Sequence, residues 1–424
     1  MFVLRSSQAL LRSPRLPGSL GSRSIASNST SSAPVASADE PVNKTQGRRK
    51  IPTRRPPIST EAPRKWNRPI GEGVLPAYDL ALKLIQKDSF RLKHEAEALR
   101  SEIEAQEAEI EKHPDETVLT AKDKELENMR KRLHILEVQS EINLPNVRWN
   151  VANALVDMTN PAQRHLLEQR WRREGGLDLL MERVYQMHVV PDVLPELHPS
   201  IDLHVTATAL PQEICLTSKT DKEVEPGVFL LPQQTLKPPK LYANVFHADT
   251  RLYTMILVDL DVPDEDKSRF STFLHWMKPN VPLSAAHSGR IPDLDMHTTY
   301  IPPHPQHGTP YHRYVLLLLP QPPASGSDYN LNLTARASRD QVTSAYLDIP
   351  VVGNADRKGF NVRAFVQQWG LDGAQGGGVH MFRQIWDADV SRIYAEILKE
   401  EEPRYGRPRK PDPYAEIKRT KLYT

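Results

Sequence analysis

The sequence predicts an α+β protein in which a mostly antiparallel β-domain with flanking helices follows an α-helical hairpin and lies between basic tails. Three observations support this prediction. From residue 201 onwards, short apolar segments alternate with Pro-rich turns, as in an antiparallel sheet. Two long upstream segments repeat apolar residues at heptad spacing, as paired helices do. Lys and Arg gather at both ends of a chain whose net charge is only +2.

The composition is typical of a soluble globular protein with polar extensions. Its 424 residues allow two or three domains, and 39% of them are hydrophobic and 25% charged. A single cysteine, Cys215, excludes an intramolecular disulfide and a multi-cysteine zinc site. No apolar run approaches the roughly 20 residues of a membrane-spanning helix. We therefore predict no membrane insertion.

The first 38 residues are typical of a mitochondrial presequence. They contain Arg5, Arg12, Arg15 and Arg23, many serines and no acidic residue. An ordinary disordered basic terminus would have a similar composition. We predict that the protein works in the mitochondrial matrix after residues 1–38 have been removed.

Basic tails flank an acidic body. Residues 1–70 have a net charge of +10 and residues 403–424 of +5, which leaves −13 for the rest. We predict that the Pro-rich extension 39–72 and the tail 403–424 bind nucleic acid, although a solvated linker would look similar. The candidate RNA contacts are Arg48, Arg49, Lys50, Arg54, Arg55, Arg64, Lys65, Trp66, Arg404, Arg407, Arg409 and Lys410.

Residues 73–176 are predicted to be helical. A heptad seam from Tyr78 to Ile110 predicts one long helix, and a second seam from Leu119 to Leu136 follows the helix-breaking residues 113–115. Two seams joined by a short break predict an antiparallel hairpin over residues 78–140. The hairpin either docks on the body or projects towards a partner; the few apolar residues beyond the seam favour projection.

The β-domain is predicted over residues 177–402. A helix that begins at Asn160-Pro161 and ends at Gly175-Gly176, and a further helix at 177–187, lead into it. The predicted strands are 203–207, 228–231, 241–246, 253–258 and 315–319, and the predicted later helices are 360–370 and 388–399. The run 315–319 is apolar at every position, which predicts a strand buried on both faces.

Candidate functional residues surround two of these strands. Asp259 and Asp261 follow the strand 253–258, and because side chains two apart in an extended chain share a face, both carboxylates are expected to point the same way. His275 lies in the next segment, and His312 and Tyr314 precede the strand 315–319. Carboxylate, imidazole and phenol groups together predict a small pocket for an anionic or polar group.

These motifs resemble the phosphatidylethanolamine-binding protein (PEBP) family. The family's Asp-Pro-Asp-Ala-Pro segment reads Asp-Leu-Asp-Val-Pro at 259–263, and its Gly-Thr-Gly-x-His-Arg-Tyr segment reads Gly-Thr-Pro-Tyr-His-Arg-Tyr at 308–314. The resemblance spans about residues 177–402. It implies a PEBP-like fold, and it implies an anion pocket made by Asp259, Asp261, His275, His312 and Tyr314.

The family pattern is altered at the walls of the pocket, so we interpret it as vestigial. Leu260 and Pro310 replace a Pro and a Gly of the family motifs, and the segment 302–308 is longer and contains His304 and His307. A ligand-free buried polar cluster that fixes the fold is therefore the preferred interpretation. A metal site that recruits His304 and His307 lacks close ligand spacing. No motif predicts a cofactor or a catalytic nucleophile.

The presequence, helical extension and PEBP-like domain together resemble a component of the mitochondrial large ribosomal subunit. This resemblance implies a structural, non-enzymatic role in the central protuberance, with ribosomal RNA and neighbouring ribosomal proteins as partners. The alternatives are a soluble mitochondrial module that binds phospholipid head groups or small anions, and an inhibitor of a protease or kinase. Basic tails and a long helical arm favour the ribosomal role, since a compact binding module needs neither.

Overall fold

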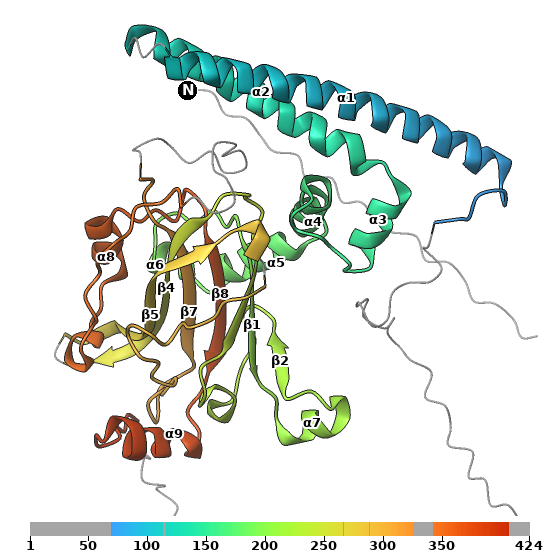
Figure 1. Cartoon of the computed structure of the whole chain (residues 1–424). Helices are drawn as coiled ribbons and strands as arrows, with labels where there is room; N and C mark the ends of the chain where they lie inside the picture. The colour runs from blue at the N-terminus through green and yellow to red at the C-terminus, as the bar shows by residue number, and fades with distance from the viewer. Residues whose placement is uncertain (1–68, 113–115, 266, 288, 325–341, 407–424) are drawn as a thin grey trace, which may run out of the picture. The chain divides into compact units, whose positions relative to one another are not determined.

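The structure, a computed structural model, describes residues 69–112, 116–265, 267–287, 289–324 and 342–406 (Figure 1). These residues belong to one compact unit, Pro57–Thr424. The predicted presequence, nearly all of the Pro-rich extension and most of the C-terminal tail lie outside the described residues. Among the helices within the described ranges, none combines the length and apolar composition needed to cross a bilayer.

The predicted helical hairpin is present. Helix α1 (Pro76–Lys112) packs antiparallel against α2 (Glu116–Ile142), and Ala96, Ile103, Leu126 and Val138 are buried. Three ion pairs cross the hairpin: Lys93 Nζ lies 2.6 Å from Glu141, Arg100 Nη2 lies 2.5 Å from Glu137, and Arg130 pairs with Glu107. As the residue numbers rise along α1 they fall along α2, which defines the antiparallel register.

Four shorter helices connect the hairpin to the β-domain: α3 (Pro145–Ala152), α4 (Pro161–Arg173), α5 (Gly176–Gln186) and α6 (Val189–Asp192). Helix α4 begins as predicted, because the Asn160 side chain accepts hydrogen bonds from the amides of Ala162 and Gln163. At its other end, Trp171 stacks on Phe246 with ring centroids 5.7 Å apart. This contact attaches α4 to the β-domain.

Two antiparallel four-stranded sheets form the β-domain (Figure 1). One sheet has the order β2-β1-β3-β6, made by β1 (Asp202–Thr208), β2 (Asp221–Val224), β3 (Lys240–Asn244) and β6 (Gly289–Arg290). The other has the order β5-β4-β7-β8, made by β4 (Arg251–Asp264), β5 (Arg269–Leu283), β7 (His312–Pro320) and β8 (Gly378–Gln384).

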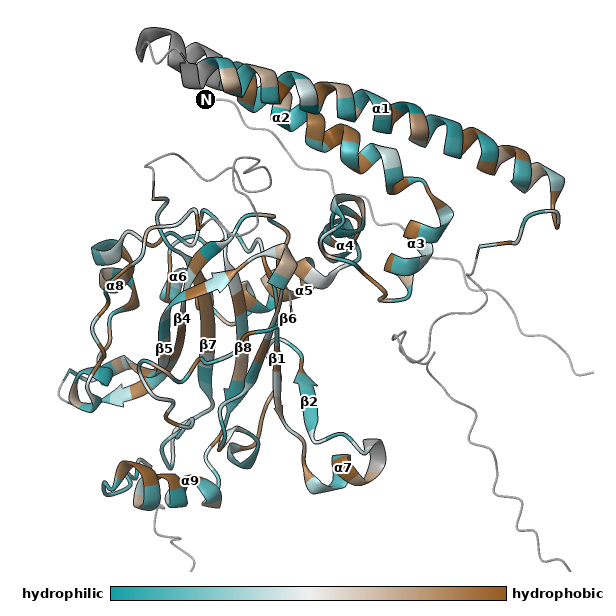
Figure 2. Cartoon of the chain, in the orientation of Figure 1, coloured by the Kyte–Doolittle hydropathy of each residue, from teal (hydrophilic) through white to brown (hydrophobic). Residues whose placement is uncertain are grey.

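Apolar residues cover both faces of the second sheet (Figure 2). Leu316 and Leu318 of β7 belong to a core shared with β1 and β3, whereas Leu317 and Leu319 pack with α5 and with α8 (Val362–Trp369). The prediction that β7 is buried on both faces is confirmed. The remaining short helices are α7 (Pro211–Thr217), η2 (Pro232–Thr235), η3 (Ala285–His287), η4 (Asn354–Arg357), α9 (Ala388–Arg392) and η5 (Ile393–Leu398).

The strand predicted at 228–231 is wrong. That segment makes one isolated parallel bridge, between Phe229 and Arg383 of β8, and then enters η2. Gly227 has a φ of +78° and Pro232 begins η2, so the extended stretch between them is short. Strand β4 is also longer than predicted: it continues through Asp259 and Asp261 and contains several bulges against β5.

A buried histidine–carboxylate cluster as candidate functional site

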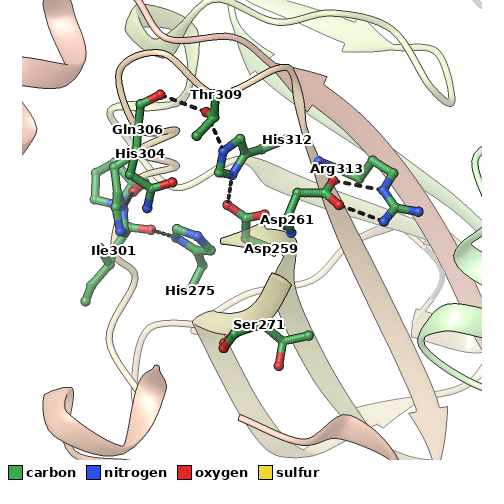
Figure 3. Close-up of polar contacts among 12 residues, drawn as sticks. Asp259, Asp261, Ser271, His275, Ile301, His304, Gln306, Thr309, His312 and Arg313 are labelled. Atoms are coloured by element: carbon green, nitrogen blue, oxygen red, sulfur yellow. Dashed lines mark hydrogen bonds and ion pairs between the residues drawn. The ribbon is translucent and has the colours of Figure 1, made fainter. Parts of the chain in front are cut away.

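Strands β4, β5 and β7 bring four of the five predicted pocket residues together, and Figure 3 labels three of these, Asp259, His275 and His312. Asp259 of β4 pairs with Tyr314 of β7, His312 lies two residues earlier on β7, and His275 comes from β5. Asp259 is 2% exposed, and the other three are fully buried. We call these four residues the histidine–carboxylate cluster.

The hydrogen bonds of His312 define its protonation state. Its Nδ1 lies 2.7 Å from Asp259 Oδ2, and its Nε2 lies 2.9 Å from Thr309 Oγ1. Because the Thr309 hydroxyl donates to the Gln306 carbonyl at 2.7 Å, Thr309 accepts from His312 Nε2. Both ring nitrogens then donate, so His312 is an imidazolium paired with the Asp259 carboxylate.

The pKa shifts agree with this assignment. Burial lowers the pKa of His312, but attraction to Asp259 and their hydrogen bond outweigh burial, so the pKa is raised. Burial likewise raises the pKa of Asp259, but the charge and hydrogen bond of His312 outweigh it, and the pKa is lowered. The cluster thus contains a buried ion pair whose charges compensate each other.

The expectation that the Asp261 carboxylate points the same way as the Asp259 carboxylate is wrong. Its carboxylate accepts two hydrogen bonds from the Arg313 guanidinium, at 2.8 and 2.7 Å, and a third from the Arg313 amide at 2.9 Å. The Asp261 amide donates to Asp259 Oδ1, and the β4–β5 register shifts between Asp259 and Val262. Because the strand is bulged there, side chains two residues apart no longer share one face. Figure 3 shows the two carboxylates turned towards different partners.

His304 occupies the space beside His275. Its ring centroid lies 5.0 Å from that of His275, 4.9 Å from that of Phe273 and 5.4 Å from that of Tyr394. Its Nδ1 lies 2.9 Å from the Pro302 carbonyl, which fixes the ring. His275 Nδ1 lies 2.9 Å from the Ile301 carbonyl, and burial lowers the pKa of His275 to about 3, so this ring is neutral.

Residues 402–406, which we call the strap, lie against the segment 302–308, which contains His304 and His307. The Tyr405 amide donates to the His307 carbonyl at 2.7 Å, and Glu402 accepts from Trp386 Nε1 at 2.5 Å. Gly308 has a φ of +88°, and a Cβ there would overlap the Tyr405 carbonyl oxygen. Only glycine fits at this position, for conformational and for steric reasons.

Sequence reasoning missed the strap and assigned no definite role to His304. In the structure, the His304 ring packs against His275 and Phe273. Within the described residues, no group of three His, Cys, Asp or Glu side chains is arranged to hold a metal ion. Arg404 lies on the strap with an exposed side chain, and it is the sole candidate RNA contact within the described ranges. The longer segment 302–308 was the signal for the changed site.

Sequence comparison agrees with the fold. The family model for phosphatidylethanolamine-binding protein matches residues 220–350, so this part of the chain is a PEBP domain. The large ribosomal subunit protein mL38 of Schizosaccharomyces pombe is 28% identical over 263 residues, which cover 62% of this chain and 74% of that protein. The protein MOTHER of FT and TFL1 homolog 2 of Oryza sativa subsp. japonica is 28% identical over 145 residues, 34% of this chain and 67% of that protein.

Two solved structures match about half of this chain. The carboxypeptidase Y inhibitor, crystallised with its cognate proteinase, covers 49% of this chain and 94% of its own, with 16% identity and a TM-score of 0.31. The phosphatidylethanolamine-binding protein of Plasmodium falciparum covers 48% of this chain and 96% of its own, with 13% identity and a TM-score of 0.28.

Proposed function

We propose that this protein is a structural, non-enzymatic component of the large subunit of the mitochondrial ribosome, in contact with ribosomal RNA and neighbouring ribosomal proteins in the central protuberance. The observation that carries the proposal is the similarity to a large ribosomal subunit protein over 263 residues. That similarity is longer than the match to the PEBP family at 220–350, so it includes part of the chain outside that match.

The internal hydrogen bonds of the histidine–carboxylate cluster support a structural role for the PEBP domain. A site that captures a small anion needs an open cavity and donors that are free to bind. Here a cavity of about 530 Å³ reaches His312 and Asp261, but both nitrogens of His312 are engaged in hydrogen bonds and His304 fills the space beside His275. These features favour the ribosomal component over the small-anion binding module.

The charge distribution supports RNA contact through the tails. An acidic body repels RNA, whereas Lys and Arg in the segments 41–69 and 403–424 replace counterions on phosphates. Pro-rich chain remains extended and can follow an irregular surface. In this proposal the five-part division, with boundaries near residues 38, 72, 176 and 402, separates the import signal, the RNA-binding tails, the helical arm and the PEBP domain.

Sedimentation tests the proposal. Full-length epitope-tagged protein in mitochondrial lysate should co-sediment with large-subunit RNA in a sucrose gradient at low salt. A variant without residues 41–70 should dissociate at lower salt while its far-ultraviolet circular dichroism remains unchanged. If the intact protein stays at the top of the gradient at low salt, the ribosomal proposal is wrong.

Import is tested separately. A fluorescent protein fused behind residues 1–60 should enter mitochondria, because residues 1–38 contain four arginines and no acidic residue. The matched control replaces Arg5, Arg12, Arg15 and Arg23 with Gln, which should leave the fusion in the cytosol. Cytosolic fluorescence of the unaltered fusion would contradict a matrix location.

A further inference from the structure

Helix α1 extends beyond the helix that covers it. Helix α1 has 37 residues and α2 has 27. Lys93 faces Glu141, one residue before α2 ends, so residues 76–88 of α1 run past that end for about 20 Å. Figure 1 shows the blue end of α1 projecting beyond α2. We call residues 76–88 the overhang.

The overhang is apolar on two opposite sides. Tyr78, Leu82 and Ile85 continue the hairpin seam and are only half-buried. Leu80 and Leu84, one turn apart, lie about 150° around the helix from that seam, and they are 69% and 70% exposed. Apolar positions therefore recur around this end of α1 (Figure 2). A helix that is apolar on opposite sides is normally buried on both.

A cavity begins where α2 ends. Its volume is about 650 Å³, and it is lined by Leu84, Ile85, Asp88 and Ser89 of α1, Gln139 and Ser140 of α2, and Asn143 and Arg148. Arg148 Nε donates to the Ile142 carbonyl at 2.9 Å and so binds the last turn of α2. The cavity therefore lies beside the overhang, where the hairpin lacks a continuing second helix.

Positive charge beside Leu80 and Leu84 indicates which kind of partner the overhang can bind. Lys83 and Lys87 are exposed, one turn apart, and they flank the Leu80–Leu84 row. Asp88 is paired with Arg91, and Asp79 accepts a hydrogen bond from the Gly73 amide, so the nearby carboxylates have other partners. An amphipathic helix with an apolar stripe and two acidic residues one turn apart complements this surface.

We propose that the overhang is the docking site for an acidic amphipathic helix of a neighbouring large-subunit ribosomal protein, which packs on Leu80 and Leu84 and pairs with Lys83 and Lys87. This inference rests on the proposed ribosomal function and specifies one of its protein contacts. The docked helix packs on the side of α1 opposite the hairpin seam and buries two exposed leucines.

The test uses full-length protein in mitochondria. Leu80→Ser/Leu84→Ser should weaken retention in the large-subunit fraction at least about tenfold, because both leucines become buried on docking. Lys83→Glu/Lys87→Glu should weaken it in the same direction through repulsion. Both variants should unfold in urea like the wild type, since the altered side chains are exposed. Tyr346→Ser and Lys124→Glu/Lys237→Glu are the matched exposed controls, and they should be retained normally.

Photocrosslinking identifies the occupant. A benzoylphenylalanine at position 84 should crosslink to a large-subunit ribosomal protein, within a segment whose apolar residues recur every three or four positions with acidic neighbours. Crosslinks to RNA, to a second copy of this chain or to its own residues 1–68 would overturn the docking proposal. If the wild type co-sediments and the leucine variant is retained equally, the docking proposal is wrong and the ribosomal function stands; if the wild type does not co-sediment, the function itself is wrong.

Discussion

At the scale of single residues, the ion pair between His312 and Asp259 determines the character of the site. Both groups are buried and each is the other's charge partner at 2.7 Å. Removing one member of such a pair leaves the other charge buried alone, which is strongly destabilising. The pair therefore fixes β7 to β4 only as long as both members are present.

We expect His312→Ala to lower the free energy of unfolding by about 3 kcal/mol at pH 7, because Asp259 loses its partner. Urea denaturation of the full chain measures this change, and His287→Ala, at an exposed histidine, is the control. Inorganic phosphate at millimolar concentration should not raise the midpoint of the wild type. A saturable increase that His312→Ala abolishes would restore the anion-binding interpretation.

Two other buried histidines, His275 and His380, should make the stability of the folded protein sensitive to acid. Burial lowers the pKa of His275 to about 3 and that of His380 to about 4. Below the unfolded pKa of about 6.5, the unfolded chain binds protons that the folded chain does not, so stability falls as the pH falls. His312 has a raised pKa, so its contribution is already complete below pH 6.5 and does not offset this loss.

Each of these two histidines should therefore lower the free energy of unfolding by about 2 kcal/mol between pH 7 and pH 5. Urea midpoints across this range give the slope. His380→Leu should lower stability at pH 7, because the Val224 carbonyl loses its hydrogen bond, yet its stability should depend less on pH than that of the wild type. An unchanged slope in this variant would show that His380 is not buried neutral.

At the scale of elements, the start of helix α4 is fixed by the side chain of Asn160. Asn160 caps its first turn, and its Nδ2 donates to Glu141 of α2 at 2.7 Å. We expect Asn160→Ala to destabilise the full chain by about 1–2 kcal/mol, because a cap and a helix–helix hydrogen bond are lost together. Asn160→Ser keeps a capping oxygen and should recover part of this loss in the same urea titration.

Elements with strong periodicity could be predicted from the sequence, and irregular ones could not. The heptad seams predicted α1 and α2, and the run 315–319 predicted a strand buried on both faces. Strand β8 was missed because it begins in a glycine-rich segment; Gly377 has a φ of +108°, and a Cβ there would overlap the Leu318 carbonyl. Gly377 allows the backbone to pass close to β7, and this tertiary contact cannot be read from the local sequence.

The sequence predicted most of the residues of the candidate site, but not how their side chains are arranged. The motifs indicated Asp259, His275, His312 and Tyr314, and the fold brings them together. Asp261 was misplaced because a bulge depends on the pairing of β4 with β5, which residue alternation does not reveal. The strap was missed because its contact with the histidine segment joins Tyr405 to His307, about 100 positions apart.

At the scale of the whole molecule, charge separates the tails from the body. Arg407, Arg409 and Lys410 follow the strap in the sequence, so replacing all three with Ala leaves residues 402–406 unchanged. We expect this triple variant to dissociate from large-subunit RNA at lower salt, with the slope of log affinity against log salt reduced by about 2–3. Lys124, Lys237 and Lys399, replaced together, provide a control of equal charge. Equal slopes for the two variants would contradict RNA contact through the tail.

The strap also implies an order of events during synthesis of the chain. His312 and Asp259 come together once β7 has paired with β4, whereas Glu402 and Tyr405 lie about 90 residues further along the chain. A chain that emerges from its N-terminus therefore forms the ion pair first and the contact with the strap last. Until residues 402–406 have been synthesised, the segment 302–308 lacks its hydrogen bond to Tyr405, so we expect this contact to be among the last that the PEBP domain forms.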